Sequence, residues 1–439
     1  MGSRKLGFKK TDIGWIPEDW QLVQIRDLCS AVVNGGTPSR EKSAYWNQGN
    51  IRWLKTQEIQ DWYVWDTQER ITELGLRESS AKMVPEKTII VAMYGATAGR
   101  IAIAGCPLST NQACCNLVVE PTKVYYLFLF YSLLTHRKRL IDFANGAAQQ
   151  NLNQESVIAL RIPVPAVPEQ KRIALLFGSL DHKIELNRKI NKTLEEIAWA
   201  IFKRWFIDFE FPNENGEPYK SSGGEMIDSP LGPIPKRWRI GTVAEICERI
   251  ENGGTPKRMR SDYWGGTIPW FKTGELNDGP LISSEEKITE LGLRESSCKL
   301  WPAGTVLIAL YASPTVGRLG ILASPGTSNQ ACSGLIPKSE YGSRFVFFSL
   351  LFERESLQHV AVGAAQQNIS QKIIREQQIV IPDLKIIMIF QKIANPLHSL
   401  VTSLIIQNSR LSKIRDSLLP KLMSGEIRVP VSEKEDDQL

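Results

Sequence analysis

The chain repeats itself, and this duplication limits its possible folds more than any other feature. Residues 72–80 (TELGLRESS) return unchanged at 289–297, an offset of about 218 residues. The same offset relates the other shared segments: Asn-Gly-Gly-Thr-Pro at 34–38 and 252–256, Tyr-Trp at 45–46 and 263–264, 110–114 and 328–332, and Gly-Ala-Ala-Gln-Gln-Asn at 146–151 and 363–368. A constant offset excludes coincidence, so we expect two similar globular domains.

Each copy is followed by a long amphipathic segment. Between residues 168 and 206, apolar side chains recur at alternating steps of three and four, with Asn187 and Asn191 in the two middle positions. This pattern predicts a helix of about 57 Å that lies along another helix. An ordinary amphipathic helix packed on a globular core is the alternative reading.

A second helix is expected from about Ile389. Pro396 is expected to disturb its first turn and to delay its start, and Pro420 with Gly425 should end it. Asn408 occupies the position equivalent to Asn191, where a polar side chain would fix the register of the pair. The candidates for the contact between the helices, or with a partner, are Leu180, Ile184, Asn191, Leu194, Val401, Leu404, Asn408 and Leu411.

Short apolar runs and helical stretches alternate within each copy. Residues 87–93 and 305–310 are bounded by turn residues and predict buried strands, whereas 125–143 and 344–360 predict helices. The fold class is therefore mixed α+β, with two similar globular α/β domains. The expected parts are domains at 1–166 and 211–384, helices at 167–210 and 385–425, and a flexible acidic tail at 426–439.

The composition is that of a cytoplasmic protein without a membrane span. No apolar run approaches the roughly 18 residues that a membrane helix needs, and the first ten residues lack a signal-peptide core. The seven cysteines form no C-x-x-C pair, and the four histidines do not recur between the copies, so we expect no metal site. A net charge of +6 permits nucleic-acid binding without requiring it.

Cations, aromatic residues and amides recur at equivalent positions, and these are the candidate DNA contacts. Gly-Gly in the Asn-Gly-Gly-Thr-Pro segment could form a phosphate nest, but a tight turn is the commoner meaning. Glutamine and asparagine can read adenine in the major groove, although they also brace loops. The candidates are Arg40, Lys42, Lys55, Thr56, Tyr94, Arg100, Asn111, Gln112, Gln149 and Gln150 in the first copy, and Lys257, Arg258, Lys272, Thr273, Tyr311, Arg318, Asn329, Gln330, Gln366 and Gln367 in the second.

The two copies diverge in one stretch. Residues 61–65 (DWYVW) have no expected counterpart in 277–281 (NDGPL). Divergent loops on a repeated scaffold are where specificity usually lies.

No candidate active site recurs between the copies. The small-residue loop at Gly95 lacks the Lys-Ser/Thr of a phosphate loop, and no Asn/Asp-Pro-Pro-aromatic tetrad for amine methylation is present. Residues 382–385 resemble a fragment of a nuclease motif but lack its spaced second carboxylate. No catalytic residue is therefore proposed, and binding is the favoured class of function.

Taken together, these motifs resemble the specificity (S) subunit of type I restriction-modification enzymes. The recurrent Asn-Gly-Gly-Thr-Pro, Tyr-Trp and Ile-x-Trp-(Leu/Phe)-Lys segments are similar to its target recognition domains. Residues 168–174, 205–209 and 411–425 resemble its conserved helical regions. One departure is that 383–390 lacks the Pro-x-x-Glu-Gln that starts the first helix.

The resemblance implies a non-catalytic DNA-recognition subunit. Two target recognition domains would be held apart by two antiparallel helices with pseudo-twofold symmetry, and each would read one half of a bipartite site in double-stranded DNA. The helices would set the spacer and dock two modification subunits, while two restriction subunits would complete the complex. This chain would bind no cofactor: S-adenosylmethionine would belong to the modification subunits, and ATP and Mg²⁺ to the restriction subunits.

The similarity of the two copies carries a further expectation: their half-sites should be related, so that the target is partly an inverted repeat. Two other classes of function stay open. A stand-alone DNA-binding regulator would bind a split site without a methyltransferase. A scaffold unrelated to DNA would show no salt-dependent DNA affinity.

Overall fold

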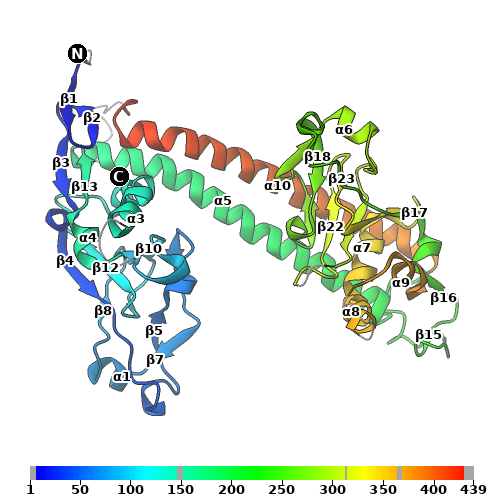
Figure 1. Cartoon of the computed structure of the whole chain (residues 1–439). Helices are drawn as coiled ribbons and strands as arrows, with labels where there is room; N and C mark the ends of the chain where they lie inside the picture. Colours follow the sequence, from blue (N-terminus) through cyan, green and yellow to red (C-terminus); the bar gives the residue numbers. More distant parts are fainter. Residues whose placement is uncertain (1–5, 146–151, 312–313, 363–367, 430–439) are drawn as a thin grey trace. The chain divides into compact units, whose positions relative to one another are not determined.

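The computed structural model describes residues 6–145, 152–311, 314–362 and 368–429 (Figure 1). The chain divides into two units with separate hydrophobic cores. The first unit comprises residues 1–183 and 410–439, and the second comprises 184–409. The boundaries fall within the two long helices, so each unit contains a part of both.

The first unit is built on two sheets. The larger has the order β4-β12-β9-β10-β6, in which only the pairing of β10 with β6 is parallel, and the smaller has the order β7-β5-β11-β8. The first unit's strands are β1 Phe8–Thr11, β2 Gly14–Pro17, β3 Gln21–Gln24, β4 Cys29–Asn34, β5 Ile51–Leu54, β6 Tyr63–Val64, β7 Glu69–Ile71, β8 Met83–Val84, β9 Ile89–Ala92, β10 Ile101–Ala104, β11 Leu108–Thr110, β12 Cys114–Val119 and β13 Arg161–Val164. Its short helices are α1 Glu73–Arg77, α2 Tyr126–Thr135, α3 Arg137–Asn145 and α4 Gln154–Ala159.

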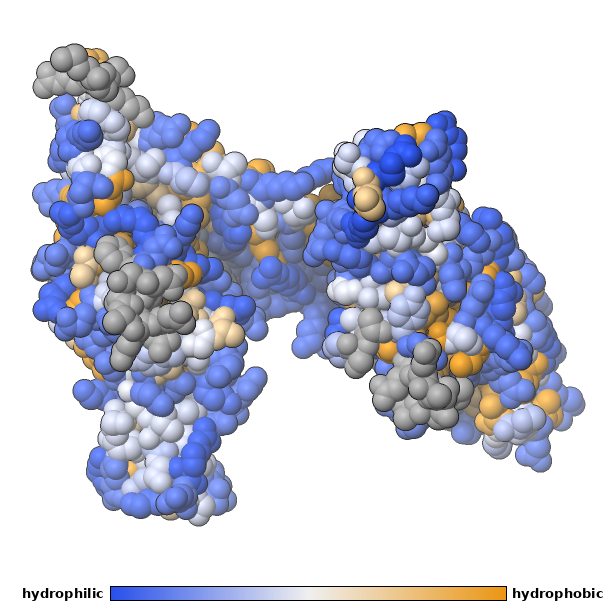
Figure 2. Space-filling view, in the orientation of Figure 1, coloured by the Kyte–Doolittle hydropathy of each residue, from blue (hydrophilic) through white to orange (hydrophobic). Residues whose placement is uncertain are grey.

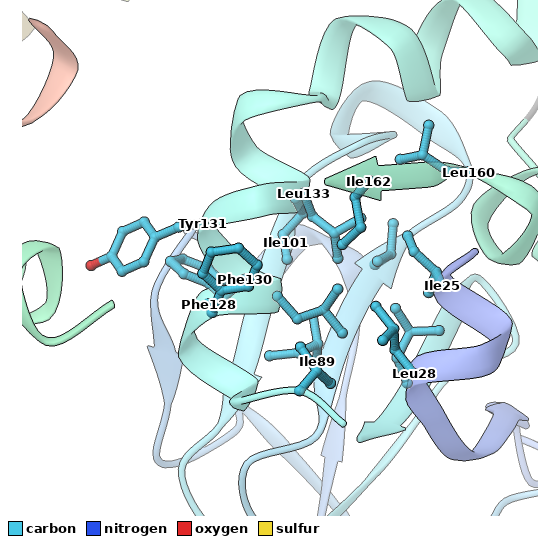
Figure 3. Close-up of a cluster of buried hydrophobic side chains, with 14 of the residues drawn as sticks. Ile25, Leu28, Ile89, Ile101, Phe128, Phe130, Tyr131, Leu133, Leu160 and Ile162 are labelled. Atoms are coloured by element: carbon cyan, nitrogen blue, oxygen red, sulfur yellow. The ribbon is translucent and has the colours of Figure 1, made fainter. Parts of the chain in front are cut away.

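The core of the first unit lies between the larger sheet and α2. Strand β9 is buried along its whole length, and α2 buries every residue from Leu127 to Leu133, because a helix that is apolar on all sides must be enclosed. Figure 3 shows Ile89 and Ile101 of the sheet beside Phe128 and Phe130 of α2. Both long helices add to this core, through Phe177 near one helix start and Leu422 near the other helix end.

The second unit repeats this architecture, as the duplication predicts. Its larger sheet has the order β17-β24-β21-β22-β19, again with one parallel pairing at its edge, and its smaller sheet has the order β20-β18-β23. Its strands are β14 Met226–Ile227, β15 Ile234–Pro235, β16 Arg239–Thr242, β17 Cys247–Asn252, β18 Trp264–Phe271, β19 Gly279–Leu281, β20 Glu286–Ile288, β21 Val306–Ala309, β22 Leu319–Leu322, β23 Thr327–Ser328, β24 Cys332–Pro337 and β25 Gln378–Ile381. Its short helices are α6 Glu290–Arg294, α7 Gly342–Phe352, α8 Arg354–Val362 and α9 Gln371–Glu376.

The long helices are α5 Val167–Phe202, which continues as a π-helical turn Lys203–Ile207, and α10 Leu384–Met423. The first agrees with its predicted span. The second starts five residues before Ile389 and one residue before the expected boundary at 385, and it runs through both Pro396 and Pro420, so neither proline limits it. It ends just before Gly425, whose φ of +72° suits a helix terminus.

The two helices run antiparallel within the second unit. Ile184 and Asn187 of α5 contact Asn408 of α10, and fifteen residues farther along α5, Phe202 packs on Phe390. The asparagine that faces Asn408 across the helix pair is Asn187. Asn191 is buried, but Asn187 donates the hydrogen bonds to Gln407 and Asn408.

The segment expected as a flexible tail begins in an ordered way. The Arg428 guanidinium pairs with the carboxylates of Glu169 and Asp19, and Val429 packs on the first core. Residues 430–439 lie outside the described part of the chain. Among the described helices, none is both long and apolar enough to cross a membrane.

Candidate nucleic-acid interface

A cluster of cations and tryptophans stands on the smaller sheet of the first unit, with an exposed arginine over a half-buried and a buried tryptophan. The Arg40 guanidinium lies 3.7 Å from the centre of the Trp46 ring, and Trp46 packs edge-on against Trp53 at 5.0 Å. Arg40 donates to one Glu69 oxygen at 2.6 Å, and Lys55 donates to the other at 3.0 Å. Because Trp53 and Glu69 are paired across β5 and β7, the sheet itself sets this geometry. We call Arg40, Trp46, Trp53, Lys55 and Glu69 the first tryptophan cluster.

The second unit has the same arrangement. Arg258 lies 3.9 Å from the centre of the Trp264 ring, and Trp264 packs against Trp270 at 5.1 Å. Arg258 donates to both oxygens of Glu286, and Lys272 reaches Glu286 at 3.5 Å. We call these five residues the second tryptophan cluster. It differs in its carboxylate contacts, because Arg258 meets both oxygens of its glutamate and Lys272 donates instead to Glu285 at 2.7 Å.

The Asn-Gly-Gly-Thr-Pro segment supports each cluster as a tight turn. The amides of Gly35 and Gly36 donate to the carbonyls of Cys114 and Thr110, and those of Gly253 and Gly254 make the equivalent bonds. These N–H groups are thus used internally, which argues against a phosphate nest. A Cβ on Gly36 would lie 2.3 Å from the Ser80 backbone, so the close approach requires glycine. The Gly36 carbonyl accepts the indole N–H of Trp53 at 2.9 Å.

The carboxylates keep the clusters charged. The hydrogen bond from Arg258 holds the pKa of Glu286 below its ordinary value, and the hydrogen bond to Glu285 raises the pKa of Lys272. The side chains remain accessible, since 52% of the surface of both Arg40 and Arg258 is exposed. Each cluster is therefore a rigid, solvent-facing array of cations that its own carboxylates partly neutralise.

The structure places the other candidates in different surroundings. Lys42 is exposed and donates to the Tyr45 hydroxyl at 2.8 Å, whereas Lys257 is exposed and forms no ion pair with any described residue. Thr56 and Thr273 are buried. Arg100 donates to the Ile59 carbonyl, Tyr94 is exposed, and Tyr311 and Arg318 are half-buried.

The amide candidates beside the clusters are tied into the turn. The hydroxyls of Thr37 and Thr255 donate to Gln112 and Gln330, which are both exposed. Asn111 and Asn329 are half-buried. The four remaining amides lie outside the described residues: Gln149, Gln150, Gln366 and Gln367.

Comparing the two copies in the sequence did not reveal that Asp61 and Asp278 are equivalent, so the divergent stretch was started one residue too early. Asp61 and Asp278 occupy the same structural position, with φ of 59° and 62°. Each accepts the backbone N–H of a strand residue at 2.9 Å and an arginine from a following helix, Arg137 in one unit and Arg354 in the other. An aspartate that tolerates positive φ was the available signal. The expectation that the segment has no counterpart is therefore wrong at its first residue, and the units diverge only after this aspartate.

The divergent segment of the first unit is aromatic, and two arginines lie beside it. Trp65 is 59% exposed and stacks on Tyr63 at 5.4 Å, and the Tyr63 hydroxyl lies 2.8 Å from that of Tyr126. On the face of β5 opposite Trp53, Arg52 and Arg70 share the Asp66 carboxylate at 3.1 and 2.9 Å. We call Arg52 and Arg70, with the Asp66 carboxylate that they share, the arginine pair. The equivalent residues of the second unit are Pro269, Ser283 and Lys287.

The long helices expose apolar side chains beyond their mutual contact. Within the second unit, Ile184, Asn187, Asn191 and Val401 are buried, and Leu194, Leu404 and Asn408 are half-buried. In the first unit, Leu180 and Leu411 are half-buried. The apolar side chains that remain exposed on these helices are Leu175, Leu176, Leu186, Ile197, Leu384, Met388, Ile389, Ile393, Leu400 and Ile414. Elsewhere the visible surface is largely hydrophilic (Figure 2).

Comparison with known proteins agrees with the duplication. A family model described as the type I restriction modification DNA specificity domain matches twice, at residues 17–196 and 235–415. The MjaIX specificity subunit of Methanocaldococcus jannaschii, a type I restriction enzyme component, is 30% identical over 431 residues, covering 96% of each chain. The HindI specificity subunit of Haemophilus influenzae is 27% identical over 370 residues, covering 71% of this chain and 80% of the relative.

A solved structure supports the fold. The crystal structure of the S subunit of a type I restriction-modification system from M. genitalium matches with a TM-score of 0.60 at 17% identity. The match covers 94% of this chain and 97% of the other.

Proposed function

Since the chain belongs to the type I restriction-modification DNA specificity family, we propose that each unit reads one half of a bipartite DNA target. Members of this family provide DNA recognition and not catalysis, so the reaction belongs to other subunits. The observation that carries the proposal is the paired occurrence of the tryptophan cluster, with the same aromatic, cationic and acidic side chains in both units. Two equivalent reading surfaces on one chain suit a site with two halves.

The clusters would contact the DNA backbone. Arginine that is stacked on tryptophan and held by a carboxylate has already lost side-chain freedom, so binding a phosphate requires less ordering. Phosphate would share or replace the carboxylates of Glu69 and Glu286. Base readout would then come from neighbouring amides such as Gln112 and Gln330, which are exposed and oriented by a threonine.

The long helices would set the spacer between the half-sites. Thirty-six residues of α5 make a rod of about 54 Å, which exceeds the roughly 34–36 Å between half-sites one DNA turn apart. Two helices that set a spacing must keep one register against each other, and the Asn187–Asn408 hydrogen bond would maintain it.

The partners would dock on the same helices. Exposed apolar side chains such as Ile197 on α5 and Met388 on α10 suit a protein interface more than open solvent. We propose that two modification subunits bind there and supply S-adenosylmethionine and adenine flipping. Two restriction subunits would complete the complex and bring the ATP and Mg²⁺ sites. The complex would act in the cytoplasm.

Adenine-methylation mapping tests this function. The chain would be co-expressed with the modification subunit from its own locus, and methylated adenines would be mapped across a genome. A single interrupted motif, methylated on both strands, is the expected result. Methylation that is absent, or that persists without this chain, would contradict the proposal. Tight binding to a split site without any methyltransferase would instead favour the stand-alone regulator.

A further inference from the structure

We propose that the target is partly an inverted repeat: the half-sites share the bases read beside the tryptophan clusters and differ where the first unit carries the arginine pair. This inference rests on the proposed function and adds the composition of the target. It also assigns residues 62–70, with Arg52, as the segment that makes the two half-sites different.

The shared part of the surface agrees in its ring contacts and its turn, although the lysine and arginine contacts to the carboxylates differ in detail. The arginine-to-tryptophan distances are 3.7 and 3.9 Å, and the paired tryptophans lie 5.0 and 5.1 Å apart. Both turns make the same two hydrogen bonds from backbone amides, and each exposed glutamine accepts from the equivalent threonine of its own unit. Surfaces with the same donors and acceptors in the same geometry bind the same base edges. Two copies of one reading surface therefore specify half-sites that share bases.

The frame around the divergent segment is also the same in both units. Asp61 and Asp278 hold the chain at equivalent points through one arginine and one strand amide each. Near the end of the segment, Glu69 and Glu286 occupy equivalent places and pair with Trp53 and Trp270. The backbone therefore follows a common scaffold, and the units differ in the side chains of residues 62–68, at Arg70 and at Arg52 on β5.

Those side chains differ in chemistry. The first unit presents two guanidinium groups that Asp66 fixes, with 35% and 41% of the Arg52 and Arg70 surfaces exposed. The second unit has Pro269 and Lys287 there, which offer one point charge and no planar fork. An arginine fork matches the O6 and N7 acceptors of guanine. The first half-site is therefore expected to hold a G·C pair at a position where the second half-site does not require one.

Segment exchange tests the inference in the full chain with its modification subunit. One variant carries residues 279–287 of this chain in place of 62–70, together with Arg52→Pro. The expected methylated motif keeps its shared bases and its second half, while the differing position in the first half changes to match the second. A milder variant, Arg52→Lys with Arg70→Lys, should relax the G·C requirement at least tenfold without a change of backbone. Arg77→Ala is the matched control, since Arg77 is 75% exposed on a segment that both units share.

The possible results separate the inference from the proposed function. If the parent chain directs an interrupted motif whose halves share no base in inverted orientation, the inference is wrong while the bipartite function stands. If the motif is partly inverted but both variants keep its first half unchanged, the assignment to the arginine pair is wrong. If the parent chain directs no methylation, the proposed function itself fails.

Discussion

Asn187 on α5 donates a hydrogen bond to Asn408 on α10 across the helix pair of the second unit, at 2.8 Å. The side chain of Asn187 is fully buried, so its amide depends on this partner. We predict that Asn187→Leu or Asn408→Leu alone lowers the free energy of unfolding by roughly 1–3 kcal/mol, because each variant removes the hydrogen bond between the asparagines, although Gln407 remains an acceptor for Asn187 at 2.7 Å. The double leucine variant should recover most of this loss, because an apolar seam packs without polar groups. Chemical denaturation of the four proteins measures the coupling energy.

Asn191 provides the control for this cycle. It is also buried in the seam, and its Oδ1 atom, like that of Asn187, has no hydrogen-bond partner among the described residues, but the bonds to Gln407 and Asn408 come from Asn187. Asn191→Leu should therefore be neutral or stabilising and should show no coupling to Asn408→Leu. A coupling as large as that of Asn187 would contradict the observed pairing.

A second polar contact joins the helices in the first unit. Asp181 accepts from Arg415 at 2.5 Å and from the Tyr131 hydroxyl at 2.7 Å, and the Asp181 side chain is only 9% exposed. We predict that Asp181→Asn costs roughly 3 kcal/mol of stability, because the half-buried guanidinium loses its buried counter-charge and keeps only the exposed Asp416. Tyr131→Phe should cost only about 1 kcal/mol, since one hydrogen bond is lost. Equal losses in thermal unfolding would show that the ion pair adds nothing.

The start of the C-terminal segment should respond to pH. Arg428 bridges Glu169, whose side chain is 6% exposed, and Asp19, and its hydrogen bond lowers the pKa of Asp19 below the ordinary 3.8. A carboxyl group whose pKa is lower in the folded state stabilises the fold at pH values above its pKa in the unfolded state. This stability is lost as the pH falls through its pKa in the folded state. Arg428→Met should therefore cost roughly 2 kcal/mol at neutral pH. Its penalty should shrink below about pH 4.

The control for the pH effect is Lys421→Met, which removes an exposed cation near the end of α10. Its effect on stability should be small and nearly constant over the same pH range. An Arg428 penalty that stays constant down to pH 3 would mean that Asp19 does not take part.

The periodicity of the sequence was sufficient for the architecture but not for the ends of its elements. The seam of α5 and the repeated motifs predicted two units and two long helices. Burial explains the early start of α10. Ile387 and Phe390 are fully buried in the second core, and this packing stabilises the first turns of the helix. Asp383 accepts the backbone N–H of Lys385, a capping bond that could have located this start.

The sequence pointed to the cations of the candidate site but not to the carboxylates that pair with them. Lys55 and Glu69 stand fourteen residues apart, and Arg40 is more distant still. They meet because β5 pairs with β7 in one particular register, which local sequence does not reveal. The positive φ of Asp61 and Asp278 was likewise hidden, since it becomes visible only when the backbone is traced.

The lysines of the clusters offer a test of backbone contact. Lys55→Ala and Lys272→Ala should weaken DNA binding to the same degree for specific and unrelated sequences, if these side chains touch phosphate. Each should reduce the slope of log K against log salt by about 0.9. Unchanged affinity in a binding titration would remove them from the interface, and loss of specificity alone would point to a base contact instead.

We expect the carboxylates of the clusters to weaken the binding of unrelated DNA sequences. Glu69 pairs with both Arg40 and Lys55, so Glu69→Gln would leave two exposed cations without their counter-charge. We predict that this variant binds unrelated double-stranded DNA several-fold more tightly at low salt, with a steeper salt dependence, because released cations can contact phosphate. Glu73→Gln is the matched control: it removes the same charge from an exposed position that pairs with no described cation. If both variants tighten binding equally, net charge alone is responsible, and the cluster carries no special role. A larger effect at Glu69, abolished by adding Arg40→Ala, would locate the phosphate contact at the first tryptophan cluster.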